Sequence, residues 1–128
     1  MRTPREVVEE LVEAYNAKSL ERILALYRPD ARFWDPLHSE GVAGRAAIGD
    51  VIGGLFESYP DEQMSVVTLV ADETHAVVEF RSVGTTASGR PFELELTEVY
   101  ETSDGQISSC RVYIDTAEIP VQAERGGH

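Results

Sequence analysis

The chain has 128 residues, a length typical of one domain and sufficient to enclose a core or a pocket. Hydrophobic residues make up 42% and charged residues 27%, which excludes a disordered chain. Eleven Lys and Arg against 23 Asp and Glu give a net charge of −12, and this charge disfavours nucleic acid and anionic membrane surfaces as partners.

The cysteine content and the hydropathy pattern bear on the cellular setting. Cys110 is the single cysteine, so an internal disulfide is excluded. The sequence has no apolar run of about 18 residues and no charged leader followed by an apolar segment. We therefore expect a cytoplasmic protein.

Two helices are predicted at the start of the chain. The first begins at the capping sequence Thr3-Pro4-Arg5-Glu6 and runs to about Ala17, with an apolar stripe at helical spacing. The second is short, begins after Ser19, has Tyr27 at the end of its inner face, and ends at Pro29.

A short strand is predicted next, over residues 31–35, because Pro36 favours extended geometry for Asp35 and offers no amide for a ladder. A glycine-bearing loop from Gly41 to Gly44 then leads into a third helix, which ends at Pro60.

After Pro60 the hydrophobic period changes from helical to two, which predicts four strands over residues 64–71, 76–86, 92–102 and 106–115. Short turns between long strands indicate an antiparallel meander. Helices that come first and strands that follow indicate an α+β fold in which the helices cover one face of a curved sheet. Residues 116–128 are expected to form a mobile tail.

Two acidic residues fall on faces that are otherwise apolar. Asp35 shares a strand face with Phe33, and Glu98 alternates in line with leucines and with Tyr100. A carboxylate on a covered face must be paired, hydrogen-bonded or neutralised, and acid/base sites are built in this way. The alternative interpretation is a solvated turn residue for Asp35 and a glutamate that points into water for Glu98.

A family resemblance rests on the segment LYRPDARFWDP, residues 26–36, followed by GRAAI at residues 44–48. This segment resembles the ketosteroid isomerase and SnoaL-like polyketide cyclase branch of the NTF2-like superfamily. The resemblance implies one domain over residues 1–115, built as a cone of three helices packed on a strongly curved, mostly antiparallel sheet. It also implies an internal apolar pocket and a homodimer formed through the outer face of the sheet.

The resemblance also implies roles for individual residues. Asp35 corresponds to the general base of the family's Asp-Pro motif, and Glu98 corresponds to its second acid, although Thr97 fits an ungapped pairing. The tyrosine of the first helix corresponds to Tyr15 after a short deletion and to Leu11 without one. Tyr27 resembles a supporting tyrosine of some members.

The reaction implied is a cofactor-independent proton abstraction next to a carbonyl, by an isomerase or a cyclase. In ketosteroid isomerases one carboxylate acts as the base while a second, protonated acid donates to the developing enolate. An apolar, ring-containing ligand is the expected partner. We expect the pocket to be walled by Tyr27, Phe33, Leu55, Phe80, Val112 and Ile114.

Two other functions remain open at this point. The same fold also serves as a non-catalytic module that binds small molecules. The ending from Arg111 to Asp115 is similar to that of limonene-epoxide-hydrolase-like members. In such a site, Arg81 would be the candidate arginine. The alternative interpretation of Arg111 and Tyr113 is an outer-face patch used in dimerisation.

Metal and cofactor sites are not predicted. The three histidines have no metal-binding spacing with an acid, and a single cysteine cannot build a zinc site. No glycine-rich phosphate loop is present. His38 lies two residues after the Asp-Pro motif, as a candidate proton shuttle or as a solvated loop residue.

Overall fold

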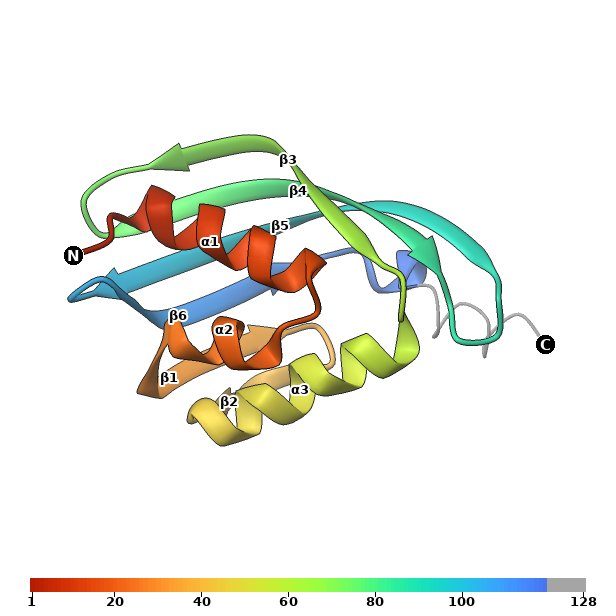
Figure 1. The fold of residues 1–128 in the computed structure, drawn as a ribbon, viewed down its shortest axis with the longest axis horizontal. Coiled ribbons are helices and arrows are strands. Elements are labelled where there is room, and N and C mark those ends of the chain that lie inside the picture. Colours follow the sequence, from red (N-terminus) through yellow and green to blue (C-terminus); the bar gives the residue numbers. More distant parts are fainter. Residues whose placement is uncertain (120–128) are drawn as a thin grey trace.

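The computed structural model describes residues 1–119, which form three α-helices on one six-stranded sheet (Figure 1). The helices are α1 (Pro4–Asn16), α2 (Leu20–Ala25) and α3 (Arg45–Ser58). The strands are β1 (Tyr27–Asp35), β2 (His38–Ala43), β3 (Gln63–Ala71), β4 (His75–Thr85), β5 (Pro91–Ser103) and β6 (Gln106–Tyr113), and a short 3-10 turn follows at Thr116–Glu118.

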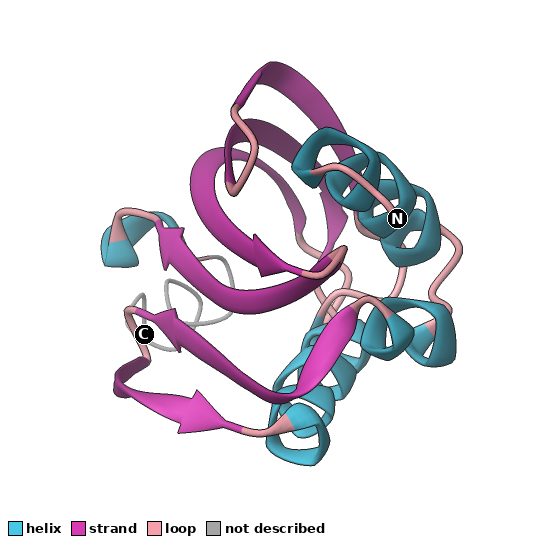
Figure 2. Ribbon diagram, turned by 90° about the vertical axis from the view of Figure 1, so that its left-hand side faces the viewer, coloured by secondary structure: helices cyan, strands magenta, loops and turns pink. Residues whose placement is uncertain are grey.

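The sheet has the strand order β2-β1-β6-β5-β4-β3. The pairing of β1 with β6 is parallel, and the other neighbours are antiparallel. The strands curve strongly, and the helices lie on one side of the sheet (Figure 2). This arrangement confirms the α+β class and the meander of β3 to β6.

Helix α1 begins where the capping sequence predicts it. The amide of Glu6 donates to Thr3 Oγ1 at 3.2 Å, and the amide of Thr3 donates to Glu6 Oε1 at 2.9 Å. These two bonds satisfy amides that would otherwise lack partners at the start of the helix. The apolar stripe that follows is buried against β3 and β4 (Figure 1).

The predicted helical position of Tyr27 is wrong. Helix α2 ends at Ala25, and Tyr27 is the first residue of β1. The cause is a contact that is distant in sequence: the amide of Ile107 donates to the carbonyl of Leu26 at 2.8 Å, which starts the parallel pairing with β6. Pro29 is tolerated in the strand because the register shifts between Tyr27 and Arg32, so no ladder bond is needed there.

The predicted loop from Gly41 to Gly44 is also wrong over most of its length, because residues 38–43 form β2, which pairs with β1. A tight turn after Asp35 makes this hairpin possible, with Asp35 opposite His38. Gly41 has a φ of 89°, and a Cβ there would lie 2.6 Å from Nε1 of Trp34, so glycine both permits this backbone conformation and leaves room for the Trp34 ring.

The end of the chain differs in part from the prediction. Strand β6 ends at Tyr113, and Asp115 instead caps the 3-10 turn by accepting from the amide of Ala117 at 3.0 Å. The predicted mobile tail therefore begins with an ordered turn, and its residues 120–128 lie outside the described residues. Within the part of the chain that is described, no helix is long and apolar enough to cross a membrane.

Candidate active site

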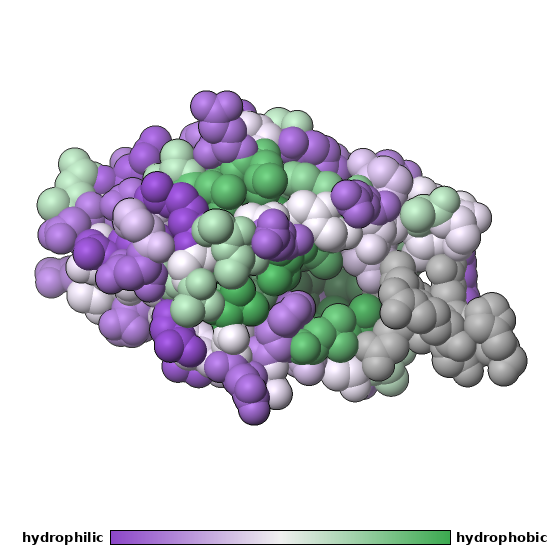
Figure 3. All heavy atoms as spheres, turned by 90° about the horizontal axis from the view of Figure 1, so that it is seen from below, coloured by the Kyte–Doolittle hydropathy of each residue, from purple (hydrophilic) through white to green (hydrophobic). Residues whose placement is uncertain are grey.

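A cavity of about 700 Å³ lies between the helices and the sheet. Hydrophobic residues gather around a hollow on the surface seen in Figure 3. The structure brings all nine predicted site residues to the lining of this one cavity: Tyr15, Tyr27, Phe33, Asp35, Leu55, Phe80, Glu98, Val112 and Ile114. Their catalytic and binding roles stay predictions.

Asp35 ends β1 and has a side chain that is 16% exposed. Its Oδ1 accepts from the amide of Leu37 at 2.9 Å and lies 2.8 Å from Nδ1 of His38. Among the described residues, no side chain or amide bonds to Oδ2. The carboxylate is therefore held through Oδ1.

Glu98 lies deep in the fold, on the inward face of β5, and the surface that it keeps faces the cavity. Burial raises the pKa of Glu98 to about 7; the hydrogen bond from Tyr100 opposes this rise and the charge of Glu62 adds to it. The hydroxyl of Tyr100 donates to Oε1, and the thiol of Cys110 lies 3.9 Å from the same oxygen. A proton on the carboxyl group is therefore best placed on Oε2.

The alternation of β5 settles which of two neighbouring residues faces inward. Thr97 pairs with Tyr113 on the opposite face of the sheet, whereas Glu98 lines the inner cavity. The prediction of Glu98 over Thr97 from strand alternation is confirmed as a matter of position.

Tyr27 and Tyr100 flank Cys110 in the core behind Glu98. Burial raises the pKa of both tyrosines and of the Cys110 thiol, so all three groups keep their protons. Tyr27 is in hydrogen-bond contact with Cys110, which links it to Glu98 only indirectly. This contact fits a supporting position in the wall of the cavity.

Tyr15 faces a partner that sequence reasoning missed. Its hydroxyl donates to Oε1 of Glu62 at 2.5 Å, and the buried hydroxyl of Ser82 donates to Oε2 of Glu62. Glu62 lies in the turn before β3, where the sequence shows no hydrophobic periodicity. It stands two residues before Met64, which also lines the cavity, and side chains two residues apart in a strand share a face. Extending the strand alternation by one step would have placed Glu62 inside.

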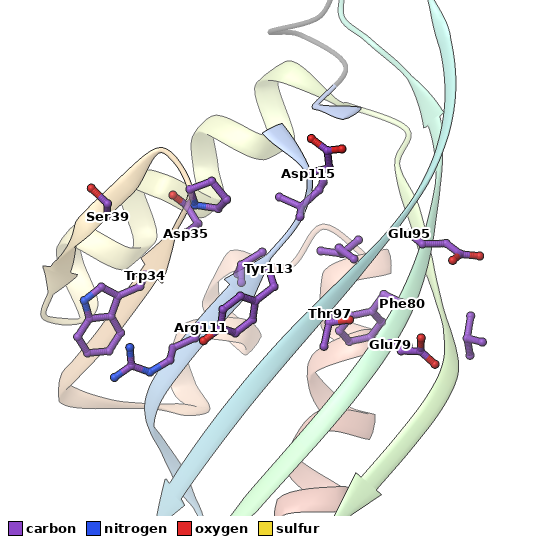
Figure 4. Close-up of a pocket in the computed structure, with 15 residues that line it drawn as sticks. Trp34, Asp35, Ser39, Glu79, Phe80, Glu95, Thr97, Arg111, Tyr113 and Asp115 are labelled. Atoms are coloured by element: carbon purple, nitrogen blue, oxygen red, sulfur yellow. The ribbon is translucent and has the colours of Figure 1, made fainter. Parts of the chain in front are cut away.

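A second cavity, of about 680 Å³, lies along the outer side of the sheet (Figure 4). Arg111 and Tyr113 of β6 reach it, and the guanidinium of Arg111 lies 4.2 Å from the centre of a Trp34 ring. Arg81 forms an ion pair with Glu93 and does not line the inner cavity. The arginine of an epoxide-hydrolase site is therefore not assembled in the inner cavity.

His38 lies at the mouth of the inner cavity, with a side chain that is 40% exposed. Ile119 also contributes to the lining, although no pattern in the sequence predicts packing beyond residue 115. Within residues 1–119, no group of three or more His, Cys, Asp or Glu side chains is arranged to hold a metal ion.

The family model of the SnoaL-like domain matches residues 8–110. This chain belongs to the SnoaL-like family. A steroid delta-isomerase from Nocardioides simplex is 34% identical to this SnoaL-like chain over 110 residues, which cover 85% of this chain and 87% of the relative.

Solved structures place the SnoaL-like chain in the NTF2-like fold. An NTF2-like protein of unknown function from Burkholderia pseudomallei superposes with a TM-score of 0.83 at 21% identity, covering 93% of this chain and 95% of that one. A protein proposed to be a polyketide cyclase, from Pseudomonas putida, superposes with a TM-score of 0.78 at 21% identity, covering 92% and 96%.

Proposed function

We propose that this SnoaL-like chain catalyses cofactor-independent abstraction of a proton next to a carbonyl group, on an apolar substrate that contains rings. The observation that carries the proposal is the placement of Asp35 and Glu98 on the lining of one cavity, with the pKa of Glu98 raised to about 7 by burial. The identity to a steroid delta-isomerase supports the same reaction class.

Asp35 is the base in this proposal. Its Oδ1 is held by the amide of Leu37 and by His38, so Oδ2 takes the proton from the carbon next to the carbonyl. The two electrons of the broken C–H bond move toward the carbonyl oxygen and form an enolate. Where the ketone carries a β,γ double bond the enolate is a dienolate, and return of the proton from Asp35 to its γ-carbon moves the double bond into conjugation with the carbonyl and gives an isomer.

Glu98 is the donor that stabilises the developing oxyanion. Its protonated Oε2 donates to the carbonyl oxygen, while Oε1 stays hydrogen-bonded to Tyr100. Tyr15 does not fill this role in the geometry observed, because its hydroxyl proton is directed to Glu62. The apolar side chains of the lining, among them Phe33, Phe80 and Leu96, exclude water and hold the rings.

Exchange of deuterium into a simple bicyclic ketone tests the proposal without knowledge of the substrate. We expect the chain to accelerate exchange of the protons next to the carbonyl of 2-tetralone in D₂O, followed by NMR. Asp35→Asn should lower the rate about 100-fold or more, whereas Asp30→Asn, an exposed aspartate of the same strand, should not. Equal rates in the two variants would contradict the assignment of the base.

Isomerisation of a β,γ-unsaturated 3-ketosteroid, followed by the absorbance of the conjugated product, then separates an isomerase from a cyclase. A non-catalytic binding module is the second candidate function, and the hydrogen bond of Tyr15 favours it because the hydroxyl of Tyr15 donates to Glu62 and not to a ligand. Tight binding of 2-tetralone without any exchange would establish the binding module over the enzyme.

We also propose that two copies of the chain associate through the outer face of the sheet. Exposed hydrophobic side chains on β4 and β6 support this, with Tyr113 at 56% and Val77 at 42% exposure. Light scattering should give twice the mass of 14.1 kDa for the wild-type chain and a monomer for Tyr113→Glu. A wild-type monomer at all concentrations would refute the association.

A further inference from the structure

We infer that Glu62 and Tyr15, with the buried Ser82 bonded to Glu62 behind them, form a second recognition point in the cavity, and that this point accepts a hydrogen bond from a hydroxyl group of the ligand. The inference rests on the proposed function for the position of the carbonyl at Glu98 and deepens it by naming the ligand class, a hydroxylated ring ketone.

The turn that carries Glu62 is fixed to the end of β4. Both carboxylate oxygens of Asp61 are used, because Oδ1 accepts from the amide of Thr85 and Oδ2 accepts from its hydroxyl, each at 2.7 Å. Gly84 allows the turn to approach closely, since a Cβ there would lie 2.9 Å from Cα of Glu62. The backbone of Glu62 is therefore held directly against β4.

The other side of the turn is fixed to the end of α1. Asn16 forms two bonds with Met64, donating to its carbonyl at 2.9 Å and accepting from its amide at 2.8 Å. Lys18 donates to the carbonyl of Glu62. Contacts from α1, from β4 and from Lys18, two residues beyond α1, thus hold Glu62 at the wall of the cavity, with 8% of the residue exposed.

The two hydroxyl groups that bond to Glu62 use their protons in these bonds. Tyr15 and Ser82 both direct their hydroxyl protons to Glu62, one to each carboxylate oxygen. The pKa of Tyr15 is raised well above its ordinary value, first by burial and then by the charge of Glu62, so the phenol keeps its proton. What remains for a ligand are lone pairs on Glu62 and Tyr15, which both line the cavity.

Glu98 has the opposite polarity. As a protonated acid it offers a donor from Oε2, which suits a carbonyl oxygen, whereas the Glu62 point suits a hydroxyl group. Within the described residues the cavity lining contains no Lys or Arg to receive an anionic group. A ligand with a ketone at one position and a hydroxyl at another therefore satisfies both points, whereas a carboxylate, which only accepts, cannot satisfy the Glu62 point.

The test compares hydroxylated ring ketones with methyl ethers of the same shape. Dissociation constants are measured by calorimetry for the 5-, 6- and 7-hydroxy-1-tetralones, each against its methoxy counterpart. We expect at least one hydroxy ketone to bind about tenfold more tightly than its methyl ether, which is the effect of one hydrogen bond to a charged group. Three positions are used so that the spacing of the two points is sampled.

Variants then locate the effect. In Glu62→Gln the hydroxyl preference should fall to about one, whereas Glu57→Gln, an exposed glutamate of α3, should retain it. If Glu62→Gln fails to fold, Tyr15→Phe is the second variant, and it should lower the preference at least about threefold because one acceptor is lost. Melting temperatures establish which variants are folded.

The inference is overturned if no hydroxy ketone binds better than its methyl ether, or if the preference survives in Glu62→Gln. Neither result bears on the proposed function, because that proposal is tested separately, by deuterium exchange at the ketone. Loss of exchange in Asp35→Asn together with equal binding of hydroxy and methoxy ketones would refute the recognition point alone. Failure of all six ketones to bind would refute both.

Discussion

Replacement of Glu98 by glutamine should remove a pH-dependent part of the stability of the folded chain. The folded protein holds the proton of Glu98 up to about pH 7, whereas the unfolded chain releases it near the ordinary value of 4.5. The stabilisation from this proton is therefore fully present below pH 4.5 and is lost as the pH rises through 7.

The magnitude follows from the interval between these two values. An interval of about 2.5 pH units corresponds to about 3 kcal/mol in the free energy of unfolding. The assay is urea denaturation of the wild type and of Glu98→Gln, each at several pH values between 4.5 and 8. Other titrating groups are common to both chains and largely cancel in the difference.

We expect the wild type to lose about 3 kcal/mol relative to Glu98→Gln over this pH range. Most of the loss should fall between pH 4.5 and 7, because above 7 the carboxyl group is ionised in both states. A difference that stays constant over the whole range would refute the raised pKa and with it the assignment of Glu98 as a proton donor.

Two other predictions follow from individual contacts. Tyr100→Phe removes the hydrogen bond that lowers the pKa of Glu98, so the loss of stability should extend to a higher pH than in the wild type. The same denaturation series measures the pH at which this loss ends. If that pH is unchanged or lower in the variant, the contact does not lower the pKa of Glu98. Gly84→Ala should destabilise the chain by about 1–3 kcal/mol, because the added Cβ meets the backbone of Glu62. Gly53→Ala is the matched change in open space within α3 and should stabilise the chain by about 0.5–1 kcal/mol, and equal melting temperatures for the two variants would show that the close approach at Gly84 is not required.

Periodicity and capping were sufficient to predict much of the fold. The capping residues of α1 and the alternation along β4 and β5 are local signals, and the structure follows them closely. Alternation alone placed Glu98 inside, because one residue step along a strand exchanges the two faces of the sheet. These signals require no knowledge of distant contacts.

Contacts between residues that are far apart in sequence explain what was missed. Strand β1 begins early because Ile107 bonds to Leu26, and no feature of residues 26–30 alone reveals that partner. Strand β2 contains two exposed polar residues and Gly41, so its sequence is typical of a loop, and only pairing with β1 makes it a strand.

The positions of Asp35 and Glu98 on the cavity lining were predicted from the sequence, but the position of Glu62 was not. Asp35 and Glu98 lie on regular strands, where a face can be assigned from the pattern. Glu62 lies in a turn whose position is set by Asp61, Gly84 and Asn16, through contacts that the sequence does not display. Alternation extended back from Met64 places Glu62 inside, but it does not reveal the hydrogen bond to Tyr15, which depends on those contacts.

A crystal structure with the fluorescent phenol equilenin bound tests the central claim most directly, because the phenolic oxygen stands for the enolate oxygen of the reaction. The account predicts that this oxygen lies within hydrogen-bond distance of Oε2 of Glu98, with the adjacent ring carbons beside Oδ2 of Asp35. A phenol bound with its oxygen away from Glu98, or seated on the outer side of the sheet beside Trp34, would contradict the account.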